Sequence, residues 1–341
     1  MFRRTQRILL LAAAAWAVSC SDGAPGSGEQ KGGPYLRCAP ARDDGVEETF
    51  RLPPLTLARD GYDLEIKGAG GGTVVLGLLA GLDEPLPATL SNTSFLLDRF
   101  RAAGVQAIAV AGGVGLAETD VERNLTALAA APVPVLVSPG AGESYDALKA
   151  VFKRLHEARP QLVDMTAVRR VRIGHVTVLS LPGYTNAFYL EAKERGCAYE
   201  AGDLDDVAGL ADRDRVNVIL SASPPRGAGL SAADRGRGGV NIGDPALAGM
   251  LGAKGIHFGL FGHVYEAGGH ATLADGATAL GQGVWQDSMR LQAGSAGAVP
   301  VQLVDGGRSV GMAQIAEFSG GRARFRTIRV AGNRAAPPPS N

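Results

Sequence analysis

The chain has 341 residues, of which 45% are hydrophobic and 20% are charged, the proportions of a globular protein. That length allows a large core and fits one large domain or two ordinary ones. The 34 basic and 34 acidic residues give a net charge of zero, so no long-range field draws the chain to nucleic acid and we expect no nucleic-acid partner.

Residues 1–19 have the pattern of a secretory signal peptide. Arginines near the start precede an apolar run, Ile8 to Val18, that is too short to span a bilayer as a mature helix. The sequence Ala17-Val-Ser-Cys20 resembles a bacterial lipobox, although Ala17 stands where Leu is usual. Acylation of Cys20 would anchor the protein in the bacterial cell envelope, on the periplasmic or outer-membrane side. The alternative is an ordinary secretory peptide that is cut elsewhere.

Two further cysteines, Cys38 and Cys197, remain as an even pair once Cys20 carries lipid. An oxidising compartment permits one disulfide between them, which would pin the N-terminal segment onto the domain. The alternative is two independent thiols.

The composition divides the mature chain into three parts. Residues 20–52 begin with the lipidated cysteine and are rich in Gly, Pro, Ser, Glu and Asp, which predicts a flexible tether. The folded domain is predicted over residues 53–330. The Pro-rich end, residues 331–341, is predicted to be a disordered tail.

Strands and helices alternate in the first half of the domain. Apolar spacing predicts strands over 73–79, 105–111 and 133–137, and helices over 91–103, 116–131 and 144–158. We expect Ser91 or Asn92 to cap the first helix, and the third is clearly amphipathic. Alternation of this kind favours parallel strand pairing.

The second half changes to short strands with glycine turns. A hairpin is predicted over 168–181 with its turn at Gly174, followed by strands over 216–220 and 256–261 and a helix over 245–251. The remaining short strands are predicted over 299–304, 311–318 and 323–330, with Gly-Gly turns at 306–307 and 320–321. Such strands add in antiparallel fashion, so we expect an α/β fold with two mixed β-sheets sandwiched between helices.

Two segments of the second half resemble a known family. Val218-Ile-Leu-Ser-Ala-Ser-Pro-Pro-Arg-Gly227 resembles the strand and Ser-His-x-Pro-Pro segment of calcineurin-like metallophosphoesterases. Gly259-Leu-Phe-Gly-His-Val-Tyr-Glu-Ala-Gly268 resembles their strand and Gly-His-x-His-Glu segment. With matching turns elsewhere, the resemblance covers roughly residues 70–330. It implies a four-layer αββα arrangement, with the site on loops at the carboxyl ends of the strands.

Most of the metal ligands that the family uses are replaced here. Of the expected ligands only His263 is clearly kept; Glu143 also survives, and Asp83 lies beyond the expected position of the first ligand pair. The replaced positions are Leu78 and Ala80, the glycines of Ala111-Gly-Gly-Val-Gly115, Ala141, Gly142, Ala222 or Ser223, and Tyr265.

These replacements argue against the family's usual mechanism. A two-metal site needs about five to seven hard oxygen or nitrogen ligands, and side chains of Leu, Ala and Gly supply none. We therefore predict that the dinuclear centre and any other cofactor are absent, and that Tyr265 fills the old cavity. A residual site for one divalent ion (Mn, Fe or Zn) would use His263, Glu266 and His270. We expect His263 to be a retained histidine at a turn without a catalytic role.

The leading hypothesis is a degenerate family member, a lipid-anchored pseudoenzyme that binds or scaffolds an unidentified protein or small molecule. One alternative is an active metal-dependent phosphoric ester hydrolase with a non-standard site, built from His263 and Glu266 with His270 or Asp83. The other is a sensor that binds a phosphate-containing ligand without cleaving it.

Overall fold

The structure is a computed structural model that describes residues 36–40 and 43–331. The predicted signal peptide, Cys20 and the end of the predicted tail lie outside these residues. The described part of the chain belongs to one compact unit. Its helices are α1 (Pro87–Ala102), α2 (Glu118–Leu128), α3 (Tyr145–Leu155), α4 (Ala201–Gly209) and α5 (Pro245–Ala253), with four short 3₁₀ turns at Ala187–Tyr189, Lys193–Arg195, Arg237–Gly239 and Tyr265–Ala267.

The larger sheet has nine strands in the order β14-β15-β13-β12-β10-β9-β4-β3-β2 within the described residues. Its centre, from β10 to β15, is parallel, because each of these strands runs beside its neighbour in the same direction. In chain order the strands are β2 (Glu47–Leu52), β3 (Leu55–Asp60), β4 (Asp63–Lys67), β9 (Arg170–Ile173), β10 (Val176–Leu181), β12 (Val216–Ser221), β13 (Phe258–Phe261), β14 (Ala271–Thr272) and β15 (Met289–Gln292).

The smaller sheet has six strands in the order β19-β18-β5-β6-β7-β8. Strands β5 to β8 are parallel, and the hairpin β18–β19 adds to β5 in antiparallel fashion. The bounds are β5 (Val74–Leu79), β6 (Ala107–Ala111), β7 (Val135–Ser138), β8 (Leu162–Asp164), β18 (Met312–Ser319) and β19 (Arg322–Arg329). Two short pairs lie outside both sheets, β1 (Leu36–Arg37) with β11 (Cys197–Ala198) and β16 (Val301–Gln302) with β17 (Arg308–Ser309).

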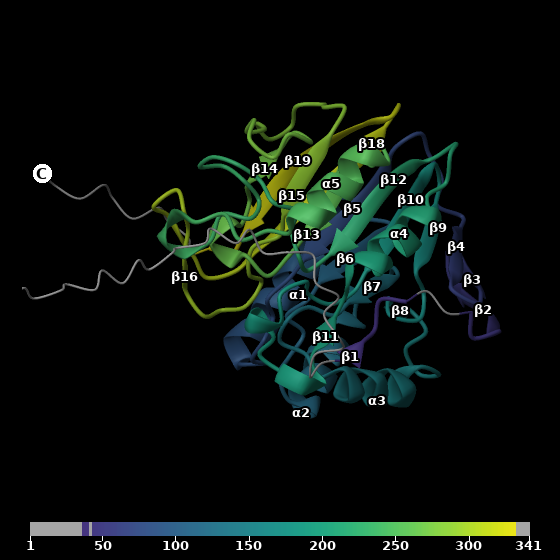
Figure 1. Ribbon diagram of the computed structural model, residues 1–341. Helices are drawn as coiled ribbons and strands as arrows, with labels where there is room; N and C mark the ends of the chain where they lie inside the picture. Colours follow the sequence, from purple (N-terminus) through teal and green to yellow (C-terminus); the bar gives the residue numbers. More distant parts are fainter. Residues whose placement is uncertain (1–35, 41–42, 332–341) are drawn as a thin grey trace, which may run out of the picture. The chain divides into compact units, whose positions relative to one another are not determined.

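Three apolar clusters define four layers. One cluster fills the space between the two sheets, with Leu76 of β5 and Val218 of β12 both fully buried in it. A second joins the smaller sheet to α1, α2 and α3, and a third joins the larger sheet to α4 and α5 (Figure 1). The predicted fold class, two mixed sheets between helices, is therefore confirmed.

The predicted domain boundary at residue 53 is too late. Strand β2 already forms six register pairs with β3, and Leu36 of β1 pairs with Cys197. A disulfide joins Cys38 to Cys197, whose Cα atoms lie 5.7 Å apart. The buried guanidinium of Arg169 donates to the carbonyl of Ala39. The described residues before 53 are thus part of the folded unit, because covalent and backbone bonds fix a segment whose composition alone resembles a tether.

The first helix also begins earlier than its sequence suggests. It starts at Pro87, whose fixed φ suits the first helical position, and no side chain caps it. Asn92, expected near the cap, is buried and donates its side-chain amide to the carbonyl of Val310 at 2.7 Å. Tertiary contacts therefore use the residue that local propensity would place at the helix end.

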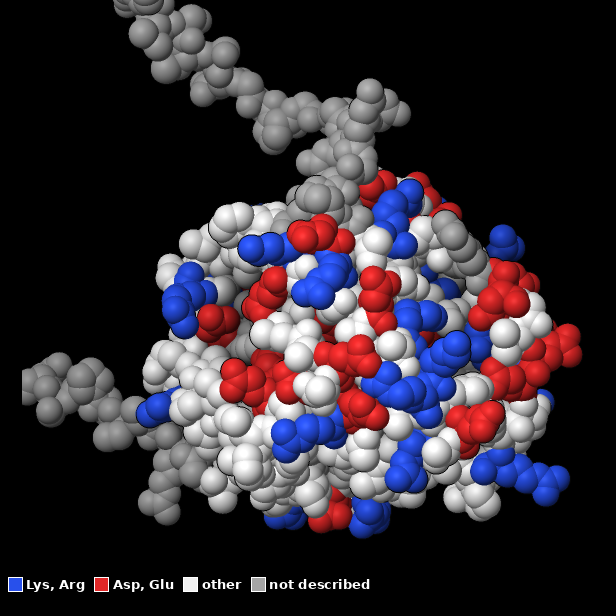
Figure 2. All heavy atoms as spheres, turned by 90° about the horizontal axis from the view of Figure 1, so that it is seen from below, with Lys and Arg blue, Asp and Glu red and all other residues white. Residues whose placement is uncertain are grey.

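No helix among the described residues is long and apolar enough to cross a bilayer. Acidic and basic side chains intermingle over the face that Figure 2 shows, as expected for a chain of zero net charge.

Candidate functional site

A pocket of about 260 Å³ lies where the carboxyl ends of parallel strands from both sheets meet. The loops after β5, β6 and β7 supply one side, and the loops after β12 and β13 supply the other. This is where open α/β sheets place their ligands. The pocket is lined by Gly81, Leu82, Asp83, Glu84, Gly112, Gly113, Leu116, Gly140, Ala141, Gly142, Glu191, Ala222, His263, Tyr265, Ser295, Gly297 and Val299.

The pocket brings together most positions at which the resemblance implies lost metal ligands. Ala141, Gly142, Ala222 and Tyr265 all line it, as do the glycines that follow β6. The two positions assigned to the first ligand pair do not. Leu78 and Ala80 are fully buried in the core between the sheets.

The ring of Tyr265 occupies the centre of this site and packs against bare backbone. A Cβ placed on Gly81 would lie 2.7 Å from Cζ of this ring, and a Cβ on Gly113 would lie 2.6 Å from its hydroxyl oxygen. Both glycines have positive φ, 63° and 75° respectively. Because glycine has no Cβ, the ring of Tyr265 can lie against both positions. No larger side chain fits at either of them while the ring is there.

Glu143 survives from the resemblance, but it binds the backbone. Its Oε1 accepts from the amide of Val114 at 2.7 Å, and its Oε2 accepts from the amide of Gly140 at 2.9 Å. The side chain is fully buried, and burial raises the pKa of its carboxyl although the amide donors oppose the shift. Glu143 thus ties together the loops after β6 and β7, and its oxygens are already engaged.

Three carboxylates give the pocket an acidic character. Asp83 accepts from the Tyr265 hydroxyl at 3.3 Å, and Glu84 and Glu191 line the same space. Burial, together with the charges of Glu143 and Glu191, raises the pKa of Asp83 to about 7. Among the described residues, neither a Lys nor an Arg lines the pocket. An anionic ligand would therefore meet repulsion here, with no cation of the wall to offset it.

His263 lines the pocket among aromatic rings. Its imidazole centroid is 4.6 Å from that of Tyr184, and its backbone has φ of 64°. Burial lowers the pKa of His263 to about 4, so the ring is neutral at pH 7 and is not the imidazolium that acts as an efficient general acid. The left-handed backbone, unusual for a residue other than glycine, is held by the surrounding turn.

The other two residues of the candidate single-ion site lie elsewhere. Glu266 and His270 do not line the pocket, and Glu266 lies 4.0 Å from the guanidinium of Arg237. Within the described ranges, no three His, Cys, Asp or Glu side chains form a group able to hold a metal ion. The structure therefore does not gather His263, Glu266 and His270 into one site.

These donors do not fit a two-metal centre. Each ion would need about four to six ligands at about 2.0–2.6 Å. The strand ends that should supply them carry glycine and alanine, Tyr265 fills the gap, and Glu143 is committed to backbone amides. The other acids of the wall are Asp83, Glu84 and Glu191, and His263 supplies the one imidazole among the described lining residues.

Sequence reasoning missed two features of this pocket. Glu191 follows an irregular 3₁₀ segment and has neither periodicity nor a motif to mark it. Ser295 donates its hydroxyl to the carbonyl of Gly81 at 2.9 Å, which closes the turn at 292–297 over the first loop. The Gly-Ser-Ala-Gly sequence of that turn was the one signal that could have found it.

No known family profile and no curated protein sequence matches the chain. Among solved structures, TT1561 of Thermus thermophilus aligns with a TM-score of 0.51 at 13% identity, over 75% of this chain and 99% of that one. A second structure gives 0.53 at 11% identity, over 75% and 99%. A dimetal phosphatase from Danio rerio gives 0.47 at 15% identity, over 75% and 98%. The first two alignments show a shared fold alone, so the chemistry of this chain has to be argued from the pocket itself.

Proposed function

We propose that this chain is a lipid-anchored protein of the bacterial cell envelope whose metallophosphoesterase fold serves as a binding or scaffolding module. One observation carries the proposal. The positions at which the resemblance implies metal ligands carry glycine, alanine and the ring of Tyr265, and among the described residues the acids of the pocket form no group of three that could hold a metal ion. The donors that a pair of dications needs are therefore not gathered here.

The same pocket argues against a sensor for phosphate-containing ligands at this position. Asp83 already has a raised pKa, because it is buried and other carboxylates lie close to it. A phosphate would add further negative charge to a wall whose described residues include no lysine or arginine. The binding role therefore belongs to a ligand of other chemistry, or to another surface of the domain.

Metal analysis combined with a phosphodiesterase assay tests the proposal. Protein purified from the envelope, then supplied with Mn²⁺, Fe²⁺ or Zn²⁺, should hold less than one equivalent of metal. It should also leave bis-p-nitrophenyl phosphate uncleaved, because too few donors converge. A functional two-metal phosphoesterase handled in parallel serves as the positive control.

His263→Ala is the matched variant. It should behave like the wild type in both measurements, since His263 alone cannot hold a pair of metal ions. Two tightly bound ions per chain, with turnover that disappears in His263→Ala, would show instead that the protein is an active hydrolase with a non-standard site.

A further inference from the structure

A second and larger cavity, of about 390 Å³, lies at the opposite edges of the sheets from the β13–β15 side. Strands β2, β3 and β4, the last strands of the larger sheet, form one wall. Helix α3 and β8, the last strand of the smaller sheet, form the other. The cavity falls in the size range of small-molecule sites. It shares no lining residue with the pocket of Tyr265 within the described part of the chain.

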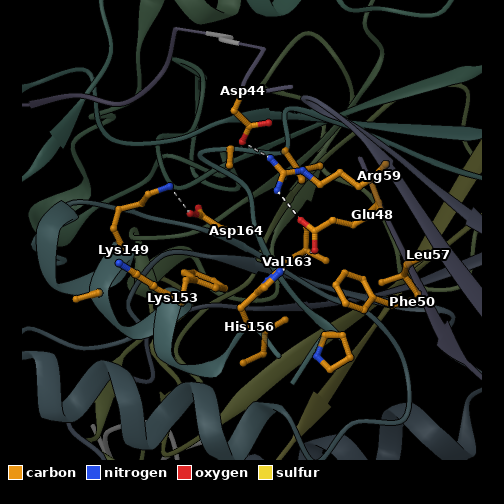
Figure 3. A pocket seen from close by; sticks show the side chains of 17 residues that line it. Asp44, Glu48, Phe50, Leu57, Arg59, Lys149, Lys153, His156, Val163 and Asp164 are labelled. Atoms are coloured by element: carbon orange, nitrogen blue, oxygen red, sulfur yellow. Dashed lines mark hydrogen bonds and ion pairs between the residues drawn. The ribbon is translucent and has the colours of Figure 1, made fainter. Parts of the chain in front are cut away.

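The interior of this cavity is apolar, and its mouth is charged (Figure 3). Leu57, Leu64 and Val163 belong to the core between the sheets and are nearly inaccessible to solvent. Phe50 of β2 stands edge-on to the ring of His156, with centroids 5.5 Å apart. Burying an alkyl chain against such a surface is favourable, because it removes apolar area from water. The interior therefore suits an apolar body.

The charged side chains at the mouth of the cavity determine which charge the polar end of a bound ligand can carry. Arg59 lies 2.5 Å from Asp44 and 3.4 Å from Glu48, and Lys149 lies 3.0 Å from Asp164. The carboxylates among the described lining residues, Asp44, Glu48 and Asp164, are therefore already in ion pairs.

Three basic residues line the cavity: Arg59, Lys149 and Lys153. The first two are in the ion pairs given above, whereas Lys153 forms none with the described residues. Its ammonium can meet an incoming anion without breaking an existing pair. An incoming cation would have to compete for an occupied carboxylate. The second carboxylate oxygen of Glu48 also lies 2.7 Å from His156 Nε2, which leaves little room for a further group at this carboxylate.

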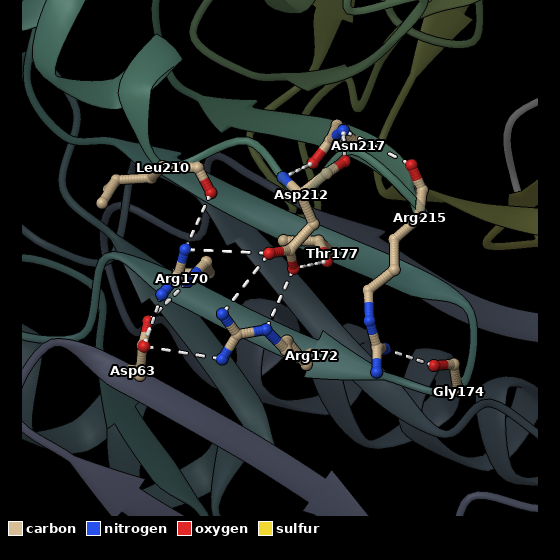
Figure 4. A network of polar contacts seen from close by, with 9 residues as sticks. All are labelled: Asp63, Arg170, Arg172, Gly174, Thr177, Leu210, Asp212, Arg215 and Asn217. Atoms are coloured by element: carbon tan, nitrogen blue, oxygen red, sulfur yellow. Dashed lines mark hydrogen bonds and ion pairs between the residues drawn. The ribbon is translucent and has the colours of Figure 1, made fainter.

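The wall formed by β2, β3 and β4 is held in place by a network of ion pairs (Figure 4). Asp63, at the start of β4, binds Arg170 of β9 through both carboxylate oxygens at 2.6 and 2.5 Å. Asp212 accepts from Arg172 of β9 at 2.9 Å and from Thr177 of β10 at 2.7 Å. The network fixes the three-stranded extension to the centre of the sheet, so the cavity is preformed.

From this geometry we infer that the cavity binds a single-chain carboxylate, that is, one acyl chain with one negative charge, whose head pairs with Lys153. The inference does not depend on the state of the metal site. A failed binding test would leave the proposed loss of hydrolysis standing, and detected hydrolysis would leave the cavity's ligand class unchanged.

Isothermal titration of the full chain with decanoate, 1-decanol and decylammonium tests the inference. Decanoate should bind more tightly than either analogue with the same tail. Lys153→Met should weaken decanoate about fivefold, the value of an exposed ion pair, and leave decanol unchanged. Ala150→Phe, which adds a ring to the cavity wall, should abolish binding of both.

Lys254→Met is the matched control, since Lys254 is also exposed and lies outside this cavity. It should bind decanoate like the wild type, and thermal melts should show all variants folded. Three results would overturn the inference: no decanoate binding by the wild type, an affinity unchanged in Lys153→Met, or binding confined to phosphatidylglycerol vesicles, which would mean a membrane surface in place of a free carboxylate.

Discussion

At the residue scale, Asp83 and His263 line the same pocket and carry opposite pKa shifts. The pKa of Asp83 rises to about 7, so the folded protein keeps a proton there that the unfolded chain loses near pH 4. The pKa of His263 falls to about 4, so the unfolded chain binds a proton near pH 6.5 that the folded protein does not bind until about pH 4. Between pH 4 and 7 the two effects on stability oppose each other.

Single variants should separate these effects. Removing Asp83 (Asp83→Asn) leaves the contribution of His263, so the free energy of unfolding should rise with pH between about 4 and 6.5. Removing His263 (His263→Gln) leaves that of Asp83, so the free energy of unfolding should fall as pH rises from about 4 to 7. Each slope can reach about 1.4 kcal/mol per pH unit. Urea titrations at several pH values measure them, and slopes equal to that of the wild type in both variants would refute the assignment.

At the element scale, the N-terminal strands depend on bonds that join distant parts of the chain. The Cys38–Cys197 disulfide spans 159 residues and lies beside the β1–β11 pair. Closing so long a loop stabilises a protein mainly by restricting its unfolded chain.

We predict that Cys38→Ala combined with Cys197→Ala lowers the free energy of unfolding by about 2–5 kcal/mol. Urea unfolding with and without reductant measures the change. Reduced wild type should match the double variant, and reductant should leave the double variant unchanged. Equal stability of the oxidised and reduced wild type would mean that β1 and Arg169 alone hold this segment.

The elements divide clearly into those that the sequence predicts and those that it does not. Apolar runs predicted β5, β6, β7, β9, β10, β12 and β13 and the hairpin that turns at Gly174, because short continuous apolar segments between turn residues are typical of strands buried on both faces. Strand β2 was missed. Its alternate residues Glu48, Phe50 and Leu52 are only partly buried at a sheet edge, so its pattern is weak among many polar residues.

The candidate site was predictable to a similar degree. The resemblance implied one site for Ala141, Ala222, His263 and Tyr265, and all four line the same pocket. Glu191 could not be predicted as a lining residue, because only the folded chain brings its irregular loop to the pocket. Composition likewise gave no sign of the apolar cavity beside α3, since its lining residues come together only when the edge strands of both sheets pack near this helix.

At the scale of the whole molecule, the proposed anchor and the mixed surface charge have a joint implication. A chain of zero net charge, with acids and bases intermingled on the face that Figure 2 shows, has little attraction of its own for anionic lipid. Membrane association should then depend on the acyl chains at Cys20.

We predict that Cys20→Ala shifts the protein from the membrane fraction to the soluble fraction and abolishes labelling by a palmitate analogue. Immunoblots of fractionated cells measure the first effect. The variant Cys38→Ala should stay with the membrane, which controls for loss of a cysteine as such. Membrane retention of unlabelled Cys20→Ala would point to an uncleaved leader.

The packing of Tyr265 against Gly81 also sets an order on any redesign of the pocket. A carboxylate or imidazole introduced at Gly81 would collide with the phenol ring, so that substitution would be harmful by itself. Redesign at Gly81 therefore has to begin with a smaller residue at position 265. Gly113 stays closed even then, because a Cβ there would lie 2.5 Å from the backbone nitrogen of Gly81.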